Sequence, residues 1–410
     1  MEPKNNKIDR RDFLKTIGAA GLGSALISAA AKADPNTAAG SEQDRGPELP
    51  QVPKRKLGKT GVDVSCLALG TMFDTLDNQI VLEKAVQYGV TYWDTAHGYE
   101  GGRSEQGIGK FLSTRPHVRN RLFIVTKASG AKTADEIEQR LQTSLSRMNT
   151  GYIDLFYGVH MLSEPAQLTD ELRLWAENAK KRKLIRFFGF STHGNMAKCL
   201  NAAAKQPWID AVLSTYNFRV MQEAELQDAV QACYDAGIGL TAMKTQGKQI
   251  QTEEDKKLTS HFLNRRFTEG QAKIKAVLED KRFSSVAVRM QNLSMLRTDV
   301  AAALDKTKLT NADRQVFKEY AQDSCDGYCA GCSEICDAAL PDAPYISDVM
   351  RYLMYCNSYG EKEMARQLFA EIPASVRNRL LSTDYIAAQA RCPQRLAIAD
   401  LVAEAVRKLA

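Results

Sequence analysis

The chain has 410 residues, of which 44% are hydrophobic and 25% are charged. These ordinary globular values exclude an intrinsically disordered chain and a protein with many membrane spans. The formal net charge is +6, but six basic and three acidic residues lie before residue 34, which leaves +3 for the rest. No cluster of basic residues indicates a nucleic-acid surface. The length predicts one barrel-sized domain plus a smaller one.

The first 33 residues have the parts of an export signal. Residues 9–15, DRRDFLK, resemble the twin-arginine motif, a mildly apolar stretch follows over 16–30, and 31–33, AKA, form a small-x-small cleavage site. The apolar stretch is too short for a stable membrane span. An amphipathic cytosolic arm is the alternative. The resemblance implies that the twin-arginine export machinery carries the folded protein, with any cofactor, to the periplasm or another extracytoplasmic compartment.

A polar, proline-containing linker over residues 34–53 precedes alternating short apolar runs and amphipathic helical patterns over residues 54–304. This alternation is typical of repeated βα units. A first hairpin over 54–64, with Gly58 and Gly61 at its turn, is predicted to close the barrel floor. The eight strands predicted after it are residues 66–70, 92–94, 122–127, 153–160, 187–191, 211–216, 239–243 and 285–289.

Eight strands that alternate with helices, such as those over 134–148 and 224–236, predict an α/β fold, a (β/α)8 TIM barrel. A doubly wound sheet is disfavoured because no GxGxxG motif follows the first strand. A charged insertion, residues 248–269, follows the seventh strand. Beyond residue 304 the pattern changes to helices around a cysteine cluster, which predicts a separate helical domain over residues 305–410.

Four residues fall at or just beyond the C-terminal ends of predicted strands, where barrel enzymes carry their catalytic groups. They are Asp94, Tyr99, Lys127 and His160. Reduction of a carbonyl by hydride needs a proton donor, and a phenol with a pKa of about 10 is a poor donor at neutral pH. We expect Lys127 to lower the pKa of Tyr99, and Asp94 to keep Lys127 charged. His160 would orient the carbonyl and assist proton delivery.

The motifs around these residues resemble those of the aldo-keto reductase family. They are WDTAxxY at 93–99, GRSE at 102–105, VTK at 125–127 and DLx4H at 154–160. The resemblance covers residues 54–304 and includes the order and spacing of the family's catalytic tetrad. It implies Tyr99 as the general acid/base and His160 as the residue that orients the substrate. Lys127 and Asp94 would tune Tyr99, and the cofactor would be NADP(H).

The resemblance also implies a set of cofactor contacts at the strand ends. Residues 189–192, GFST, stand where Gly-Val-Ser-Asn is usual, and Leu213 and Met243 stand where a Gln and a stacking Tyr are usual. Asp299 stands where an Asn commonly contacts adenine. Ordinary barrel packing is the alternative role for such positions. The implied cofactor-binding residues are Gly70, Thr71, Met72, Asp94, Ser191, Thr192, Leu213, Met243, Lys244, Arg289, Gln291 and Asp299.

Five of the nine cysteines form a pattern: Cys325, Cys329, Cys332 and Cys336 in a compact run, then the remote Cys392. Such a pattern fits a [4Fe-4S] cluster better than zinc, and the region resembles the ferredoxin-like domain fused to some aldo-keto reductases. A single cluster is predicted, with Cys329, Cys332 and Cys392 as ligands. The fourth ligand would be either Cys336 or Cys325. Disulfides are the alternative. The cysteines predicted to be buried core residues are Cys66, Cys199, Cys233 and Cys356.

Two hypotheses about function follow. The first is an enzyme that interconverts a carbonyl and an alcohol with NADP(H), on a small-molecule carbonyl or sugar-like substrate. The second is a nucleotide-holding regulatory or docking module with little turnover, whose tail meets an electron-transfer partner. The tetrad favours the enzyme, because a binding module has no need of Tyr99 beside Lys127. Both a structural and a redox-active cluster fit the sequence, because hydride carries two electrons and such a cluster passes one at a time.

Overall fold

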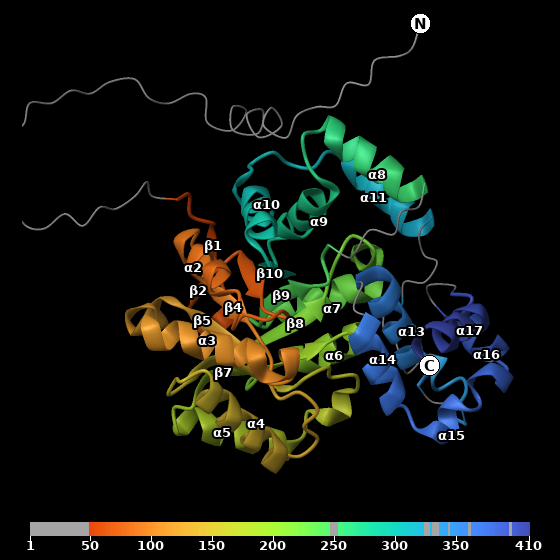
Figure 1. Cartoon of the computed structure of the whole chain (residues 1–410), viewed down its shortest axis with the longest axis horizontal. Coiled ribbons are helices and arrows are strands. Elements are labelled where there is room, and N and C mark those ends of the chain that lie inside the picture. Colours follow the sequence, from red (N-terminus) through yellow and green to blue (C-terminus); the bar gives the residue numbers. More distant parts are fainter. Residues whose placement is uncertain are drawn as a thin grey trace, which may run out of the picture. The chain divides into compact units, whose positions relative to one another are not determined.

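Eight parallel strands close into a barrel, so the predicted fold class is confirmed (Figure 1). The computed structural model describes residues 49–246, 253–323, 329, 336–342, 345–359, 362–392 and 396–410. The predicted signal segment therefore lies outside the described residues. The barrel strands are β3 (Leu67–Gly70), β4 (Tyr92–Asp94), β5 (Phe123–Lys127), β6 (Ile153–Val159), β7 (Ile185–Thr192), β8 (Ala211–Thr215), β9 (Gly239–Met243) and β10 (Phe283–Arg289).

Each barrel strand pairs in parallel with the next one in the chain, and β10 pairs with β3 to close the ring. The closing register joins Val286 to Leu67 and Arg289 to Gly70. Strands such as β5 and β8 are buried along their whole length, because the barrel interior covers one face and helices cover the other. This explains why the sequence shows continuous apolar runs rather than strict alternation.

The predicted N-terminal hairpin is confirmed as β1 (Lys54–Lys56) paired with β2 (Asp63–Ser65). Gly58 and Gly61 adopt φ angles of 50° and 73°, which favour glycine. A Cβ at Gly58 would lie 2.3 Å from the Gly237 carbonyl oxygen, just before β9 begins. The hairpin therefore lies against the N-terminal ends of the barrel strands, opposite the end where the predicted catalytic residues lie.

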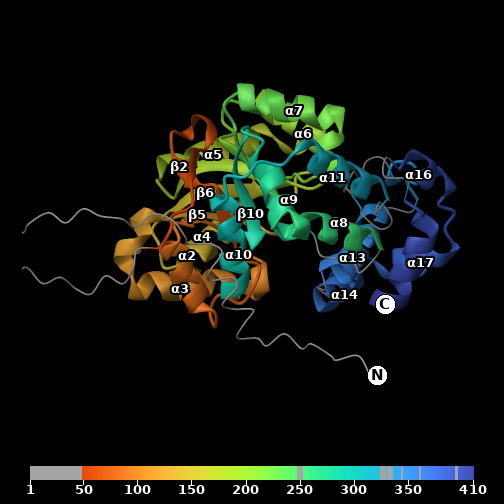
Figure 2. The same ribbon diagram turned by 90° about the horizontal axis from the view of Figure 1, so that it is seen from above.

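Helices lie around the outside of the barrel (Figure 1 and Figure 2). Local signals fix several of their ends: α4 begins with a capping box between Thr133 and Glu136, and α9 with one between Thr268 and Gln271. The helices up to residue 304 are α2 (Gln79–Gln87), α3 (Arg103–Thr114), α4 (Ala134–Arg147), α5 (Asp170–Lys181), α6 (Met196–Ala204), α7 (Ala224–Asp235), α8 (Glu253–Asn264), α9 (Glu269–Leu278) and α10 (Leu293–Leu304).

The core of the barrel region has two parts. Leu57 of the hairpin, with Tyr92, Tyr157 and Leu213, fills the interior of the barrel. A larger cluster, which includes Trp93, Phe156 and Phe188, lies between the strands and the surrounding helices. Both clusters are close-packed and hold the strand ends in fixed register.

The described part of the chain beyond residue 304 is helical, as predicted. Its helices are α11 (Asn311–Asp323), α13 (Ile346–Met354), α14 (Lys362–Glu371), α15 (Ala374–Arg377), α16 (Ile386–Arg391) and α17 (Ile398–Leu409), with a π-helical turn over Tyr355–Tyr359. Helices α13 to α17 share a core of their own, built on residues such as Val349, Leu353 and Val402. Helix α11 instead packs against α8, with Phe317 beside Phe218 and Phe262.

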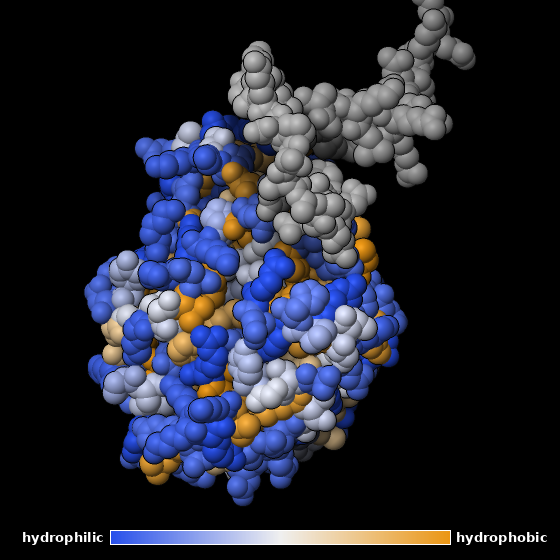
Figure 3. All heavy atoms as spheres, turned by 90° about the vertical axis from the view of Figure 1, so that its left-hand side faces the viewer, coloured by the Kyte–Doolittle hydropathy of each residue, from blue (hydrophilic) through white to orange (hydrophobic). Residues whose placement is uncertain are grey.

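The surface seen in Figure 3 is largely hydrophilic, with hydrophobic side chains in small groups. Single exposed residues such as Leu174 and Leu263 are normal for a folded protein surface. Within the described part of the chain, every helix is too short or too polar to cross a membrane.

Candidate active site

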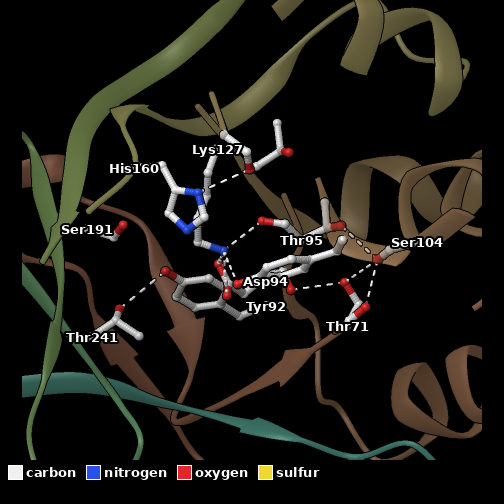
Figure 4. Close-up of polar contacts among 12 residues, drawn as sticks. Thr71, Tyr92, Asp94, Thr95, Ser104, Lys127, His160, Ser191 and Thr241 are labelled. Carbon is white, nitrogen blue, oxygen red and sulfur yellow. Dashed lines mark hydrogen bonds and ion pairs between the residues drawn. The ribbon is translucent and has the colours of Figure 1, made fainter. Parts of the chain in front are cut away.

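The parallel register aligns the C-terminal ends of β4 and β5 and so brings Asp94 and Lys127 together (Figure 4). Lys127 Nζ lies 2.7 and 2.9 Å from the two Asp94 carboxylate oxygens and donates to the Thr95 carbonyl oxygen at 2.7 Å. Both side chains are almost fully buried. Burial lowers the pKa of Lys127, but Asp94 and then Tyr99 raise it, and the net direction is upward. The ammonium therefore stays charged in the protein interior.

Tyr99 reaches this ion pair from the tight turn that follows β4. Its Oη lies 3.2 Å from Lys127 Nζ. The turn continues through Glu100, Gly101 and Gly102, all with positive φ, before α3 begins. The two glycines adopt this conformation at little cost, which explains the glycine pair in the sequence. Tyr99, Lys127 and Asp94 thus form one hydrogen-bonded chain.

The pKa of Tyr99 differs from the expectation drawn from the sequence. Burial raises the pKa of Tyr99 above its ordinary value, and Lys127 lowers it only in part. Lys127 still acts in the expected direction, because a charged ammonium stabilises the phenolate. The net effect keeps the phenol protonated at neutral pH. That is the form needed to donate a proton to a carbonyl oxygen.

His160 directly follows β6 and lies beside the Lys127 ammonium (Figure 4). Its Nδ1 lies 3.0 Å from Ser129 Oγ. The edge-to-face contact between its ring and that of Tyr99 has an interplanar angle of 74° and a centroid distance of 6.4 Å. Burial, reinforced by the charge of Lys127, lowers the pKa of His160 to about 3. The imidazole is therefore neutral, and its Nε2 can form a hydrogen bond with a substrate oxygen.

Buried hydroxyl groups tie the loops of the site together. Ser104 Oγ lies 2.7 Å from the Thr71 carbonyl oxygen and 2.8 Å from both Thr71 Oγ1 and Thr95 Oγ1 (Figure 4). Glu105, which is fully buried, accepts from Thr126 Oγ1 at 2.6 Å and pairs with Arg147 at 3.2 Å. The GRSE motif thus positions the ends of β3, β4 and β5 rather than contacting the reacting atoms.

The comparison with protein families matches residues 67–317 to the Aldo/keto reductase family. This match covers more than half of the chain and includes all four residues of the tetrad. The chain belongs to the aldo/keto reductase family.

Individual relatives are more distant. The chain is 30% identical to the uncharacterized oxidoreductase YqkF of Bacillus subtilis over 153 residues, which cover 34% of this chain and 48% of that protein. It is 24% identical to the aldo-keto reductase AFTS1 of Alternaria alternata over 231 residues, 45% of this chain and 63% of that protein. The chain thus spans about half to two thirds of the length of these curated relatives.

Two solved structures share the fold. The holo form of the aldo-keto reductase AKR11C1 from Bacillus halodurans is 21% identical, with a TM-score of 0.55 over 66% of this chain and 96% of that one. The thermostable aldo-keto reductase Tm1743, solved with the inhibitor epalrestat, is 23% identical, with a TM-score of 0.56 over 65% of this chain and 99% of that one. At these identities the likeness supports the barrel fold alone.

In this member of the family, the β7 residues implied for the nicotinamide make contacts within the protein. Ser191 Oγ accepts from the Met161 amide at 3.0 Å. Thr192 Oγ1 donates towards the Leu162 and Gly194 carbonyl oxygens, at 2.7 and 2.8 Å, and the residue is fully buried. Leu213 is buried in the barrel interior. The hydroxyl of Thr192 therefore forms hydrogen bonds that fix the loop after β6.

The remaining implied cofactor residues lie around β3, β9 and β10. Gly70 is packed so closely that a Cβ would lie 2.9 Å from the Val288 carbonyl oxygen, and Thr71 is fully buried. Asp299, also buried, accepts from Gln246 Nε2 at 2.8 Å, and burial raises the pKa of Asp299 to about 7. The partly or fully accessible members of the set are Gly70, Met72, Met243, Lys244, Arg289 and Gln291.

The cysteine cluster is only partly within the described residues. Cys329, Cys336 and Cys392 are half-buried and all pack against the core shared by α13 to α17. Cys325 and Cys332 lie outside the described residues. Among the described residues alone, no group of three or more His, Cys, Asp or Glu side chains could hold a metal ion. The four cysteines predicted to be core residues, Cys66, Cys199, Cys233 and Cys356, are buried as expected.

Three side chains near the tetrad were not identified from the sequence. His193 follows the GFST segment and lies 3.1 Å, Nδ1 to Oγ1, from Thr215. Arg351 and Tyr355 come from the helical region. Arg351 Nη1 lies 4.0 Å from Met161 Sδ. The Tyr355 ring centre lies 5.1 Å from Lys244 Nζ. His193 carries a sequence signal, its place beside a strand-end motif. Arg351 and Tyr355 carry no such sequence signal, because packing alone brings them to the barrel.

The buried imidazole of His193 should make the free energy of unfolding depend on pH. Burial lowers the pKa of His193 well below its ordinary value, whereas an unfolded chain protonates histidine below about pH 6.5. The unfolded state thus binds more protons as pH falls, so stability present at pH 7 should be lost towards pH 5. The loss should be up to about 1.4 kcal/mol per pH unit for one such imidazole.

Urea unfolding at pH 7 and pH 5 measures this difference. His193→Asn should reduce the loss of stability between the two pH values, and the exposed control His117→Asn should not change it. An equal loss in His193→Asn and the unmodified protein would contradict the assignment of a neutral, buried imidazole.

Proposed function

We propose that this protein is an NADP(H)-dependent oxidoreductase that interconverts a carbonyl and an alcohol on a small, sugar-like or other carbonyl substrate. The observation that carries the proposal is the chain of contacts from Asp94 through Lys127 to Tyr99, at 2.7 and 3.2 Å. This chain holds a protonated phenol against a fixed positive charge at the end of the barrel where such enzymes act.

The chemistry divides between the cofactor and the protein. When bound, the nucleotide supplies the hydride to the carbonyl carbon. Tyr99 donates its proton to the carbonyl oxygen, and Lys127 stabilises the phenolate that remains until solvent reprotonates it. Asp94 keeps Lys127 charged and fixed in place. In the tautomer that we propose, His160 Nδ1 accepts from Ser129 Oγ, and Nε2 carries the proton and donates a hydrogen bond that orients the carbonyl.

The side of the barrel formed by β9, β10 and α10 fits a phosphate-bearing cofactor. In such barrels, the loops after the seventh and eighth strands and the N-terminus of a following helix often bind phosphate. Here β10 ends at Arg289, and α10 begins four residues later, at Leu293. Its N-cap is Asn292, whose Oδ1 accepts from the Met295 amide. Arg289 and Gln291 would meet the phosphates, and Asp299 would lie towards the adenine.

Carbonyl-dependent oxidation of NADPH, with identification of the alcohol formed, tests the proposed activity. Nucleotide that binds tightly but is never oxidised, across a broad panel of aldehydes and ketones, would favour the alternative of a nucleotide-holding module.

We also propose a [4Fe-4S] cluster in the helical region and export by the twin-arginine pathway. The run of cysteines supports the cluster, as does the packing of Cys329, Cys336 and Cys392 against one core. Residues 9–15 support export, which would carry a folded, cofactor-loaded protein out of the cytoplasm. Both a structural cluster and one that meets an electron-transfer partner fit this arrangement.

Protein purified without oxygen should absorb broadly near about 400 nm and contain about four iron atoms per chain. Cys392→Ser should lower the iron content and the absorbance, whereas Cys233→Ser, a change within the barrel core, should lower neither. Iron-free, colourless protein after anaerobic purification from cells with active cluster assembly would contradict the cluster.

A further inference from the structure

The helical region places a cationic group over the catalytic end of the barrel. Arg351 of α13 lies beside Met161, which directly follows the catalytic His160. Four residues later, the Tyr355 ring lies against the ammonium of Lys244, which directly follows β9. Helix α13 and its π-helical turn therefore reach from the loop after β6 to the end of β9. This segment crosses the end of the barrel where the tetrad lies.

Arg351 and Lys244 share one electrostatic environment with the catalytic residues. Burial lowers the pKa of His193, and the charges of Lys244, Arg351, His160 and Lys127 lower it further. Tyr99 in turn contributes to raising the pKa of Tyr355, together with burial. These groups therefore lie within electrostatic range of one another. Burial, reinforced by the charge of Arg351, lowers the pKa of Lys244 to about 7, so an anion bound beside Lys244 would favour its protonated form. Arg351 and Lys244, both half-buried, thus lie near the residues that would handle the carbonyl.

The N–H donors of the Arg351 guanidinium have few hydrogen-bond acceptors among the described residues. The guanidinium has five N–H donors, but its one hydrogen bond within the described residues is the 4.0 Å contact with the Met161 sulfur, a weak acceptor. Burial lowers the pKa of Arg351, and Tyr355, Cys329 and Asp348 raise it, with a net direction upward. Among the described residues, however, no carboxylate forms an ion pair with Arg351 within 4.0 Å. A partly desolvated guanidinium is costly without an anionic partner, and it pairs best with a carboxylate or phosphate in a bidentate arrangement.

We propose that Arg351 and Lys244 bind an anionic group, a carboxylate or a phosphate, on the carbonyl substrate. The inference rests on the proposed function, because it places the anion beside a carbonyl held by Tyr99 and His160. It gives Lys244 a role in substrate binding in place of the cofactor contact that its sequence position implies. It also gives the helical region a direct part in substrate selection.

Matched pairs of aldehydes test the proposal on the full, anaerobically purified protein. One pair is 4-carboxybenzaldehyde and its neutral amide, 4-formylbenzamide; the other is glyceraldehyde 3-phosphate and glyceraldehyde. For at least one pair, kcat/KM should favour the anionic member by about tenfold or more, the effect of one hydrogen-bonded charge pair. The pair with the larger ratio identifies the anion as carboxylate or phosphate.

Arg351→Gln should bring that ratio close to one, and Arg351→Lys should retain part of it. Lys244→Gln should lower the ratio without weakening NADP+ binding. The exposed Arg407→Gln, on α17 of the same region, is the matched control and should leave the ratio unchanged. A ratio near one for both pairs in the unmodified protein, or a ratio retained in Arg351→Gln, would overturn the proposal. So would a Lys244→Gln protein whose only defect is weaker NADP+ binding.

Calorimetric titration with the product 4-(hydroxymethyl)benzoate and with inorganic phosphate separates this proposal from the proposed function. Binding of either ion that Arg351→Gln abolishes supports the anion site even if no aldehyde is reduced. Reduction of neutral aldehydes without binding of either ion overturns the anion site and leaves the proposed activity standing. Loss of the absorbance near about 400 nm in Arg351→Gln, with an unchanged substrate ratio, would instead assign Arg351 to the cluster.

Discussion

Tyr99→Phe should reduce the rate of carbonyl reduction by roughly 100- to 10,000-fold, the usual contribution of a positioned general acid. The substitution removes only the phenolic oxygen that lies 3.2 Å from Lys127 Nζ, and the ring keeps its place beside His160. Single-turnover oxidation of bound NADPH measures the chemical step, and fluorescence titration measures nucleotide affinity. We expect the first to fall and the second to stay within about twofold, because Tyr99 acts on the transition state.

Tyr234→Phe is the matched control for this experiment. It removes the same atom from an exposed tyrosine on α7, away from the catalytic end of the barrel, and should leave both the rate and the affinity unchanged. A Tyr99→Phe protein with nearly the original single-turnover rate would remove Tyr99 from the mechanism.

Lys127→Met should affect both activity and stability. It leaves the Asp94 carboxylate, which is 5% exposed, without its ionic partner. An unpaired buried charge typically costs about 3–5 kcal/mol, so the free energy of unfolding should fall by about that amount. The rate should fall as well, because the phenolate of Tyr99 would lose the charge that stabilises it. Urea unfolding and single-turnover kinetics measure the two effects.

The double variant Asp94→Asn/Lys127→Met separates these effects. Removing the carboxylate's charge should restore about half or more of the lost stability, because a neutral amide is cheaper to bury than an unpaired charge. It should not restore activity. If the double variant recovers the original rate, or if Lys127→Met is as stable as the unmodified protein, the role given to the ion pair is wrong.

The barrel, and the closeness of Asp94, Tyr99, Lys127 and His160, could be predicted from the sequence because both depend on local order along the chain. Asp94 ends β4 and pairs with Val125 of β5, and Lys127 lies two residues further along β5 on the same face, so the two side chains lie close at one end of the barrel. The apolar runs located most strands to within one or two residues. Strand β7, which extends over Ile185–Thr192, begins two residues earlier than predicted because the exposed Arg186 interrupts the apolar run.

Other features could not be predicted because tertiary packing decides them. The hydroxyl of Thr192 turns towards the loop after β6, and no pattern in the sequence shows this choice. The pKa of Tyr99 depends on burial, which outweighs the nearby ammonium. Arg351 is 190 residues from Met161, and only the packing of α13 against the barrel brings the two together.

The most direct test of the proposed activity follows the hydride itself. NADPH deuterated at C4 of the nicotinamide, mixed with an aldehyde and the purified protein, should give an alcohol that carries one deuterium on the former carbonyl carbon. Mass spectrometry of the alcohol should detect this label with the unmodified protein and only a trace of it with Tyr99→Phe. An alcohol without deuterium, or equal labelling by the two proteins at equal rates, would contradict hydride transfer assisted by Tyr99.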